Sequence, residues 1–323
     1  MENFEKLLYQ ASNRCSGIYD KDSFKDLLIV FGRLYPFTTE NIAGYIDFFD
    51  LEGKSLLTTG SSADQALNAV LKGCKDITIL DVNPYTKFYY YLKTAGILNF
   101  NLDEFKRFFR YKEFPTTFDD NRDVFSLDLF DMLKSDLRLL DYESYLFWDE
   151  LFNNHDLERV RNEMFSNDEG DNREVDASNL YMHDNDSYLE LRDIIKKIKP
   201  EFINNDFFNY IFNRKFDNIW FSNIAMYYPT SKMRELVDLY DGYLNDNGKL
   251  LISYLYKTKI DTDYDISWSE IYDLEKTFYL FKKYNPELIN FTGIVGLRKN
   301  DDDIKDAVLV YKKSNASPIM YEK

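Results

Sequence analysis

Two blocks of the chain alternate short apolar runs with amphipathic stretches. In the first block, Lys54–Phe100, the apolar run Ser55–Thr58 is followed by a small-residue turn, Thr59–Ala63, and an amphipathic stretch, Asp64–Lys72. A second apolar run, Ile77–Leu80, then ends in an acid. Strands of a parallel sheet are buried on both faces, so they read as continuous apolar runs rather than alternating ones. The block therefore predicts a strand–helix–strand unit with parallel strands.

The second block begins at Glu201 and repeats this alternation. It predicts strands at Glu201–Asn205, Asn218–Phe221, Lys249–Tyr256, Glu287–Gly293 and Ala307–Lys312, and helices at Ser231–Leu244 and Trp268–Tyr284. The last two strands read as a pair joined across the polar linker Lys299–Lys305. Both blocks together predict an α/β, Rossmann-like fold with a seven-stranded, mostly parallel sheet and helices on both faces.

The remaining segments are predicted to be mainly helical. Helical patterns cover Phe125–Leu140, Glu143–Phe152, Leu157–Phe165 and Tyr188–Ile198, and the polar stretch Asn167–Asp176 predicts a mobile loop. A further helix is predicted at Asn41–Phe49, with Thr38 or Thr39 as its cap. The expected organisation is an N-terminal helical cap (1–50), a first half of the core (51–100), a helical insertion serving as a lid or acceptor pocket (101–199) and a second half of the core (200–323).

The turn after the first strand and the acid after the second predict a nucleoside site. Asp81 follows Gly60 by 21 residues, and an acid at this place holds a ribose diol in nucleotide-binding folds. The N–H groups at the start of the following helix are expected to face a carboxylate-bearing ligand. The turn has one glycine where dinucleotide sites have three. S-adenosylmethionine therefore fits better than a pyrophosphate, although a glycine turn is also an ordinary feature of α/β proteins.

The order of elements resembles the core of class I S-adenosylmethionine-dependent methyltransferases, whose last strand is antiparallel. That resemblance implies that Asp206, the acid after the third strand, contacts the adenine, with Phe207 beside it. It also implies that Ser222 and Asn223, after the fourth strand, line the reaction centre. An ordinary helix N-cap is the alternative role for Asp206.

Two motifs carry a more specific resemblance. Leu57–Leu67 (LTTGSSADQAL) and Asp81–Pro84 (DVNP), followed by an aromatic helix and Ala95–Ile97 (AGI), resemble the betaine-lipid synthase family. The best-known members of that family move the 3-amino-3-carboxypropyl group of S-adenosylmethionine onto diacylglycerol. The similarity is strong in the first block and weaker around Asp217–Pro229. It implies S-adenosylmethionine as cofactor and a small-molecule or lipid-like acceptor.

The candidate site residues follow from the turn, the strand ends and these resemblances. The residues expected to bind the cofactor are Thr59, Gly60, Ser61, Ser62, Asp64, Asp81, Val82, Asn83, Asp206, Phe207 and Ser222. The expected catalytic residues are Asn223, which would orient the acceptor, and Tyr227 and Tyr228, whose rings would flank the sulfonium. Both tyrosines are alternatively packing residues. Asp64 is a candidate base or, alternatively, the N-cap of its helix.

Composition narrows the class of protein and its partners. A net charge of −16, from 40 basic and 56 acidic residues, argues against a nucleic-acid partner. Two cysteines, Cys15 and Cys74, predict no disulfide framework and fit a reducing cytoplasm. No apolar run of membrane-spanning length and no leader pattern is present, so neither a span nor a signal peptide is expected. The two histidines, His155 and His183, form no metal-binding pattern, and no metal is expected.

The sequence leaves two group-transfer reactions of S-adenosylmethionine possible. Attack at the γ carbon gives aminocarboxypropyl transfer, which the family resemblance favours, and attack at the methyl carbon gives methyl transfer. A sulfonium leaves as a neutral thioether, so positioning rather than acid–base chemistry is expected to supply most of the acceleration. A non-catalytic nucleoside-binding or assembly protein is the third hypothesis, because Thr58 and Thr59 stand where an acid usually ends the first strand. The acceptor and the oligomeric state stay open.

Overall fold

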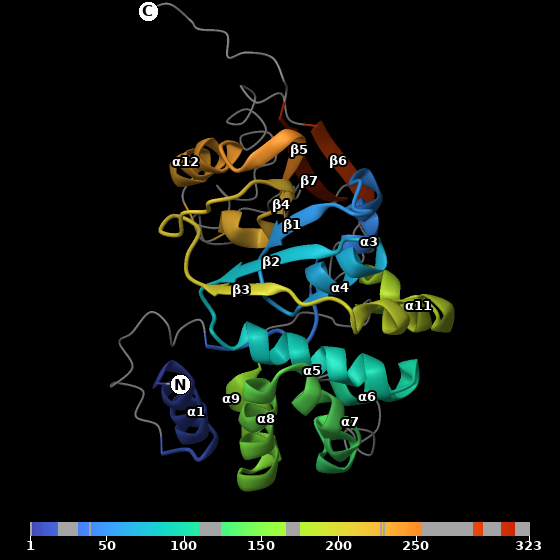
Figure 1. Ribbon diagram of the computed structural model, residues 1–323, viewed down its shortest axis with the longest axis vertical. Helices are drawn as coiled ribbons and strands as arrows, with labels where there is room; N and C mark the ends of the chain where they lie inside the picture. Colours follow the sequence, from blue (N-terminus) through green and yellow to red (C-terminus); the bar gives the residue numbers. More distant parts are fainter. Residues whose placement is uncertain are drawn as a thin grey trace, which may run out of the picture.

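A seven-stranded sheet forms the centre of the computed structural model (Figure 1), which describes residues 2–18, 32–38, 40–109, 124–165, 175–226, 228, 230–253, 287–292 and 305–313. Its strands are β1 (Ser55–Thr58), β2 (Asp76–Asp81), β3 (Glu201–Asn204), β4 (Phe216–Trp220), β5 (Leu244–Ile252), β6 (Glu287–Thr292) and β7 (Lys305–Lys312). Their order is β3-β2-β1-β4-β5-β7-β6. Neighbours from β3 to β5 are parallel, whereas β7 runs antiparallel to β5 and β6.

This strand order confirms the predicted fold class. The order reverses at β1, which pairs with β2 on one side and β4 on the other. In open α/β sheets, ligands bind beyond the carboxyl ends of the strands at such a reversal. The antiparallel pair β6–β7 at one edge completes the arrangement of a class I methyltransferase fold. Every residue of β1 is buried, as expected for a strand covered on both faces.

Helices cover both faces of the sheet. They are α1 (Glu2–Cys15), α3 (Ile42–Tyr45), α4 (Asp64–Leu71), α5 (Thr86–Asn99), α6 (Leu102–Phe109), α7 (Leu127–Leu140), α8 (Tyr142–Asn154), α9 (Leu157–Met164), α10 (Val175–Ser178), α11 (Asn185–Ile195) and α12 (Thr230–Asp241). Three 3₁₀ turns join them: η2 (Ile46–Phe48), η5 (Leu180–Met182) and η6 (Ser222–Met226). Leu56 packs into the core on the α5 side, and Leu57 into the core on the α12 side.

Helix α5 is buried on nearly all sides because it lies between two layers. The sheet covers one side, and α7 and α8 of the insertion pack on the other, with α1 beside α8 and α9 (Figure 1). The ring of Phe88 stacks on Phe147 at 4.4 Å, and the indole of Trp148 donates to the Phe88 carbonyl at 2.9 Å. An apolar surface all round is typical of such a buried helix. The insertion therefore anchors the helix that follows β2.

Three boundary predictions need correction. Strand β5 begins at Leu244, because Phe216 pairs with Leu244 across a bulge that shifts the register; the sequence predicted a helix end and a loop there. The expected helix at 41–49 is split into α3 and η2, and Asn41 caps it by accepting from Gly44 N at 3.0 Å. The Thr38 hydroxyl instead accepts from Glu40 N at 3.0 Å.

Several other predictions lie outside the described residues. These are the helix at 268–284, most of the loop at 167–176, most of the linker at 299–305, Thr39 and Tyr227. None of the helices within the described ranges has the length and apolar character that a membrane span requires.

Candidate functional site

The turn after β1 is tied to the end of β2 by Asp81. One carboxylate oxygen of Asp81 accepts from Gly60 N at 2.8 Å and from Ser61 N at 3.0 Å. The other oxygen accepts from Asn83 N at 2.8 Å. Burial raises the pKa of Asp81, and these three N–H groups oppose that rise. Asp81 thus already uses the N–H groups of Gly60 and Ser61. The expectation that the N–H groups at the start of the following helix face a carboxylate-bearing ligand stays a prediction.

Backbone strain is concentrated in this turn, but not at its glycine. Ser61 and Ala63 have positive φ angles of 39° and 70°, a region that side chains disfavour and that is enriched at functional sites. Gly60 instead allows a close approach of α5, because an added Cβ would lie 2.6 Å from the Thr86 Cβ. The glycine is thus required by packing between the turn and α5.

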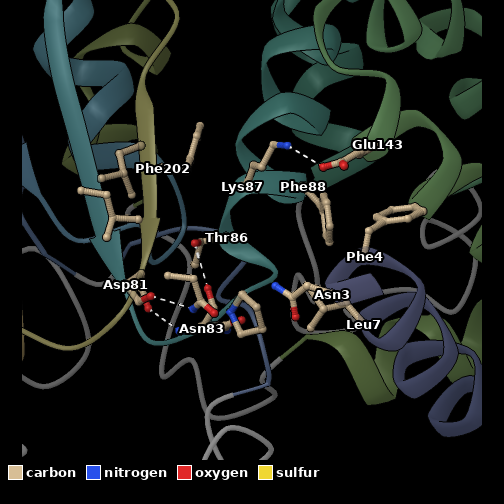
Figure 2. A pocket seen from close by; sticks show the side chains of 14 residues that line it. Asn3, Phe4, Leu7, Asp81, Asn83, Thr86, Lys87, Phe88, Glu143 and Phe202 are labelled. Carbon is tan, nitrogen blue, oxygen red and sulfur yellow. Dashed lines mark hydrogen bonds and ion pairs between the residues drawn. The ribbon is translucent and has the colours of Figure 1, made fainter. Parts of the chain in front are cut away.

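A pocket of about 240 Å³ adjoins Asp81. Figure 2 shows Asp81 and Phe202 on the strand side of the pocket and Phe4 and Leu7 of α1 on the other side. Asn83 and Phe88 also line it. Pockets with apolar and aromatic walls and a few fixed polar groups are typical of small-molecule sites. This pocket suits a flat apolar group attached to a hydroxyl-bearing one.

Asn83 and Val82 hold the chain that leads from β2 into α5. The Asn83 side chain donates to the Arg33 carbonyl at 2.8 Å and accepts from Tyr85 N at 2.9 Å. The Val82 carbonyl accepts from Asn204 Nδ2 at 3.0 Å. Asn83 is therefore a buried turn residue at the pocket wall, and its amide is already engaged by the protein.

Asp64 is fully buried and belongs to a closed network. Its carboxylate accepts from Thr38 N at 2.6 Å, Ser62 Oγ at 2.8 Å, Lys93 Nζ at 2.7 Å and Tyr181 Oη at 2.8 Å. The helix N-cap is Ala63, so the predicted cap role of Asp64 is wrong. Its binding and base roles are not favoured either, because four protein donors occupy the carboxylate. Asp64 instead joins the N-terminal segment, the turn, α5 and the insertion.

Lys93 is the cationic half of this network. Its ammonium also donates to the Ser62 carbonyl at 2.9 Å and lies 4.1 Å from the centre of the Phe37 ring. Burial lowers the pKa of Lys93 to about 8, although Asp64 opposes the change. The ion pair lies directly beneath the turn and holds Ser62 by both its carbonyl and its hydroxyl.

A second acid, which the sequence did not single out, lies at the ends of β4 and β5. Glu40 is 4% exposed. Its carboxylate accepts from Tyr45 Oη at 3.0 Å, Gln65 Nε2 at 3.0 Å, Ser222 Oγ at 2.8 Å and the Ser253 hydroxyl. Burial raises the pKa of Glu40, and the four donors oppose the rise. No local pattern marks this residue, because three of its partners are distant in the chain.

Several buried polar atoms near these two acids have no partner. Among the described residues they include Thr58 Oγ1 and Thr59 Oγ1 at the end of β1, and Gln65 Oε1 in the first turn of α4. Buried polar groups are normally satisfied. Three such unpartnered oxygens lie in β1, the turn after it and the first turn of α4.

The residues after β3 form a turn. The Asp206 carboxylate accepts from Phe208 N at 2.8 Å and Asn209 N at 3.0 Å. No helix begins there, so the helix N-cap alternative for Asp206 is wrong, and its adenine contact stays a prediction. Phe207 is 5% exposed and packs edge-on against Phe221 in the core on the α12 side. This packing does not favour the predicted contact of Phe207 with a cofactor.

The residues after β4 are only partly described. Ser222 has a positive φ of 54° and is engaged by Glu40, as given above. Asn223 follows it in η6 and is half-buried. The ring of Tyr228 packs edge-on against Phe208 at 5.2 Å, and burial raises its pKa. Tyr228 thus keeps its phenol proton at neutral pH and matches the packing alternative.

The described residues contain no group of three or more His, Cys, Asp or Glu side chains that could hold a metal ion. Both histidines lie in the insertion. His155 contacts Ser16 Oγ at 3.2 Å, and His183 contacts the Ala177 carbonyl at 3.1 Å. Neither contact involves the residues around Asp81 or Glu40.

No protein-family model and no curated protein sequence matches the chain. Solved structures similar in fold include the N-methyltransferase NodS from Bradyrhizobium japonicum WM9 in complex with S-adenosyl-L-homocysteine, with 9% identity, coverage of 95% of this chain and 98% of that chain, and a TM-score of 0.39. Magnesium protoporphyrin IX methyltransferase (ChlM) from Synechocystis PCC 6803 with bound SAM has 10% identity, coverage of 84% and 76%, and a TM-score of 0.35. Similarity this low carries no argument about activity, and the fold assignment rests on the strand order.

Proposed function

We propose that the chain is an S-adenosylmethionine-dependent transferase. The observation that carries this proposal is the position of Asp81 at the carboxyl end of β2 in a methyltransferase-type sheet. Asp81 binds the glycine turn and lines a pocket formed mainly by α1, β2, β3 and α5. Nucleotide-binding α/β folds place a ribose-binding acid at this point.

The residues present fit such a cofactor. Three N–H donors occupy Asp81, and a carboxylate has about four acceptor positions, so it retains capacity for a ribose hydroxyl. The pocket beside it has the aromatic walls of Phe88 and Phe202 for an adenine ring. Thr58, Thr59 and Gln65 offer unpartnered oxygens at the neighbouring strand end. These groups would hold the nucleoside at β2 and the amino-acid part toward β4.

The transfer we favour is that of the 3-amino-3-carboxypropyl group. It is supported by the resemblance of Leu57–Leu67 and Asp81–Pro84 to the betaine-lipid synthase family. When bound, the cofactor supplies an electrophilic carbon on a sulfonium whose sulfur leaves as a neutral thioether. The chain's own contribution is to orient the acceptor through Asn223 and to exclude water. Asp64 is closed by four donors, so it takes no part as a base.

By-product analysis tests this proposal. The protein is incubated with S-adenosylmethionine, with and without vesicles that contain diacylglycerol, and the nucleosides are separated by chromatography. Methylthioadenosine is the expected product. S-adenosylhomocysteine would establish methyl transfer instead. Cofactor binding without either product would refute diacylglycerol as acceptor and favour the non-catalytic hypothesis, and absent binding would refute the proposal.

A matched pair of variants separates the site from general damage. Asp81→Ala removes the proposed ribose contact at the carboxyl end of β2. Asp76→Ala removes an exposed acid at the other end of the same strand, where it pairs with Arg214. Product formation should fall only in the Asp81 variant. An equal loss in both variants would contradict the proposed site.

A further inference from the structure

Glu40 is a buried carboxylate whose hydrogen-bond partners among the described residues are all uncharged. Two hydroxyls reach one of its oxygens, from Ser222 and Ser253, and Tyr45 and Gln65 reach the other. Across the described part of the chain, none of the ion pairs involves Glu40. The other buried acid of this region, Asp64, has Lys93 as its counter-charge. Glu40 has no such counter-charge within the described ranges.

Burying a carboxylate without a cation is unfavourable, and proteins normally pair such a charge or bind an ion there. Four hydrogen bonds reduce this penalty but leave the charge itself uncompensated. Folds retain such arrangements chiefly at functional sites, where a ligand supplies the missing charge. The position fits this reading, because Ser222 and Ser253 follow β4 and β5 at the carboxyl edge of the sheet.

Gln65 provides a second, independent observation. Its side chain is 1% exposed, and its Nε2 donates to Glu40 at 3.0 Å and to Ser222 Oγ at 3.2 Å. These two acceptors fix which way the amide points. Its Oε1 is then buried without any partner. A bare acceptor next to an uncompensated carboxylate calls for a ligand that is both a donor and positively charged.

We infer that Glu40 and Gln65 form the receptor for the ammonium group of the cofactor's methionyl part. This inference rests on the proposed function. Gln65 Oε1 accepts one ammonium N–H directly, and Glu40 supplies the negative charge behind it through Gln65 and Ser222. An ammonium carries three donors and one positive charge, which matches this set. Glu40 thereby replaces the acid that is missing at the end of β1, where the chain has Thr58 and Thr59.

The arrangement also divides the ligand between two acids. Asp81 lies at the end of β2, on one side of β1, and takes the ribose. Glu40 contacts residues that follow β4 and β5, on the other side of β1, and takes the ammonium. A ligand that spans the reversal point therefore contacts Asp81 at one end and Gln65, backed by the charge of Glu40, at the other.

Calorimetric measurement of the affinities of three related nucleosides tests the inference. S-adenosylmethionine and S-adenosylhomocysteine both carry the ammonium, whereas methylthioadenosine lacks it and keeps the adenosine part. Glu40→Gln keeps the shape of the side chain and removes its charge. We expect the variant to bind the first two ligands at least tenfold more weakly and methylthioadenosine as tightly as the wild type does.

Each contrary result has a distinct meaning. Equal S-adenosylmethionine binding by the wild type and a folded Glu40→Gln variant overturns the inference and leaves the proposed function standing. Equal weakening of all three ligands makes Glu40 a structural residue and also overturns it. A loss confined to S-adenosylmethionine assigns the charge to the sulfonium instead of the ammonium. If the wild type binds none of the three, the proposed function itself fails.

A second variant guards against misfolding of the first. Gln65→Leu removes the bare oxygen together with the Nε2 donor to Glu40 and Ser222, and it leaves the Glu40 carboxylate in place. It should reproduce the same selective loss for the two ammonium-bearing ligands. Thermal unfolding of each variant, measured without ligand, shows that the compared proteins are folded. A Gln65→Leu variant that binds all three nucleosides as the wild type does would contradict the direct contact.

Discussion

The two acids at the sheet reversal are held in opposite ways. Asp81 is partly exposed, lines a pocket, and is bound by backbone N–H groups at most 21 residues away. Glu40 is buried and is bound by side chains, of which those of Ser222 and Ser253 lie 182 and 213 residues away. Backbone donors are available from any residue except proline, but side-chain donors require particular residues. The surroundings of Asp81 are therefore built from nearby residues of the chain, whereas those of Glu40 depend on residues that only the complete fold brings together.

The negative charges of Asp81 and Glu40 are also compensated differently. Backbone N–H groups stabilise the ionised form of Asp81 without any counter-ion, as the dipoles of a nest or a helix start do. The partners of Glu40 among the described residues are uncharged, so its negative charge can still be balanced by a positively charged ligand group. A cofactor with a neutral ribose and a charged amino-acid part matches this asymmetry.

The largest effect is expected from removing the Asp64–Lys93 ion pair beneath the turn, because this pair supports the surroundings of both Asp81 and Glu40. Lys93→Met leaves the Asp64 carboxylate buried without its cation, which costs about 3–5 kcal/mol. Urea unfolding followed by circular dichroism should show that loss. The control is Lys72→Met, since Lys72 makes an exposed pair with Asp47 worth about 0–1 kcal/mol. Similar losses in both variants would show that the buried pair has no special role.

Asp81→Ala tests the proposed ribose contact alone. Hydrogen bonds to charged groups contribute about 1.5–3 kcal/mol, so affinity for S-adenosylmethionine should fall about ten- to a hundredfold. Methylthioadenosine should weaken by a similar factor, because the variant acts on the ribose. Calorimetry gives both values, with Asp76→Ala as the control. Unchanged binding by a folded Asp81→Ala protein would remove Asp81 from the site.

Asn223→Ala tests the residues after β4 by separating an effect on turnover from an effect on cofactor binding. Once an acceptor is found, turnover should fall about tenfold while cofactor affinity stays within a factor of about two, since an orienting contact matters mainly in the transition state. Steady-state kinetics and calorimetry measure the two quantities. A proportional fall in both would place Asn223 among the cofactor contacts.

The smallest expected effect is a pH dependence of stability without ligand. The pKa of folded Glu40 lies above its ordinary value of 4.5, so the folded state holds the proton more tightly than the unfolded state does. Stability contributed by the protonated acid is thus lost as pH rises through the folded pKa. Relative to Glu40→Gln, the wild type should lose melting temperature between pH 5 and pH 8.

Asp81 shifts in the same direction, but it is present in both proteins and cancels from that difference. Saturating S-adenosylmethionine should stabilise the wild type more than Glu40→Gln at pH 8. A wild type that gains stability over the variant on going from pH 5 to pH 8 would contradict an uncompensated charge at Glu40.

The strand–turn–helix–strand unit around Gly60 and Asp81 was predictable from the sequence, because apolar runs, turn residues and spacing are all local. The fold class followed from the same alternation, with apolar runs marking strands such as β1 and β2. The sequence was less informative where distant residues decide the surroundings of a side chain. Phe207 follows the predicted adenine acid, but its ring packs against Phe221, just after β4, and Tyr240 of α12.

What the sequence by itself determined is the alternation that builds the sheet and the place of one acid after β2. Only the tertiary structure decided that Asp64 is closed by Lys93 and Tyr181, and that Glu40 meets Gln65 and Ser222 at the reversal of the sheet. The physical reason is that a buried charge is governed by whichever groups surround it. Those groups come from segments that only the folded chain brings together.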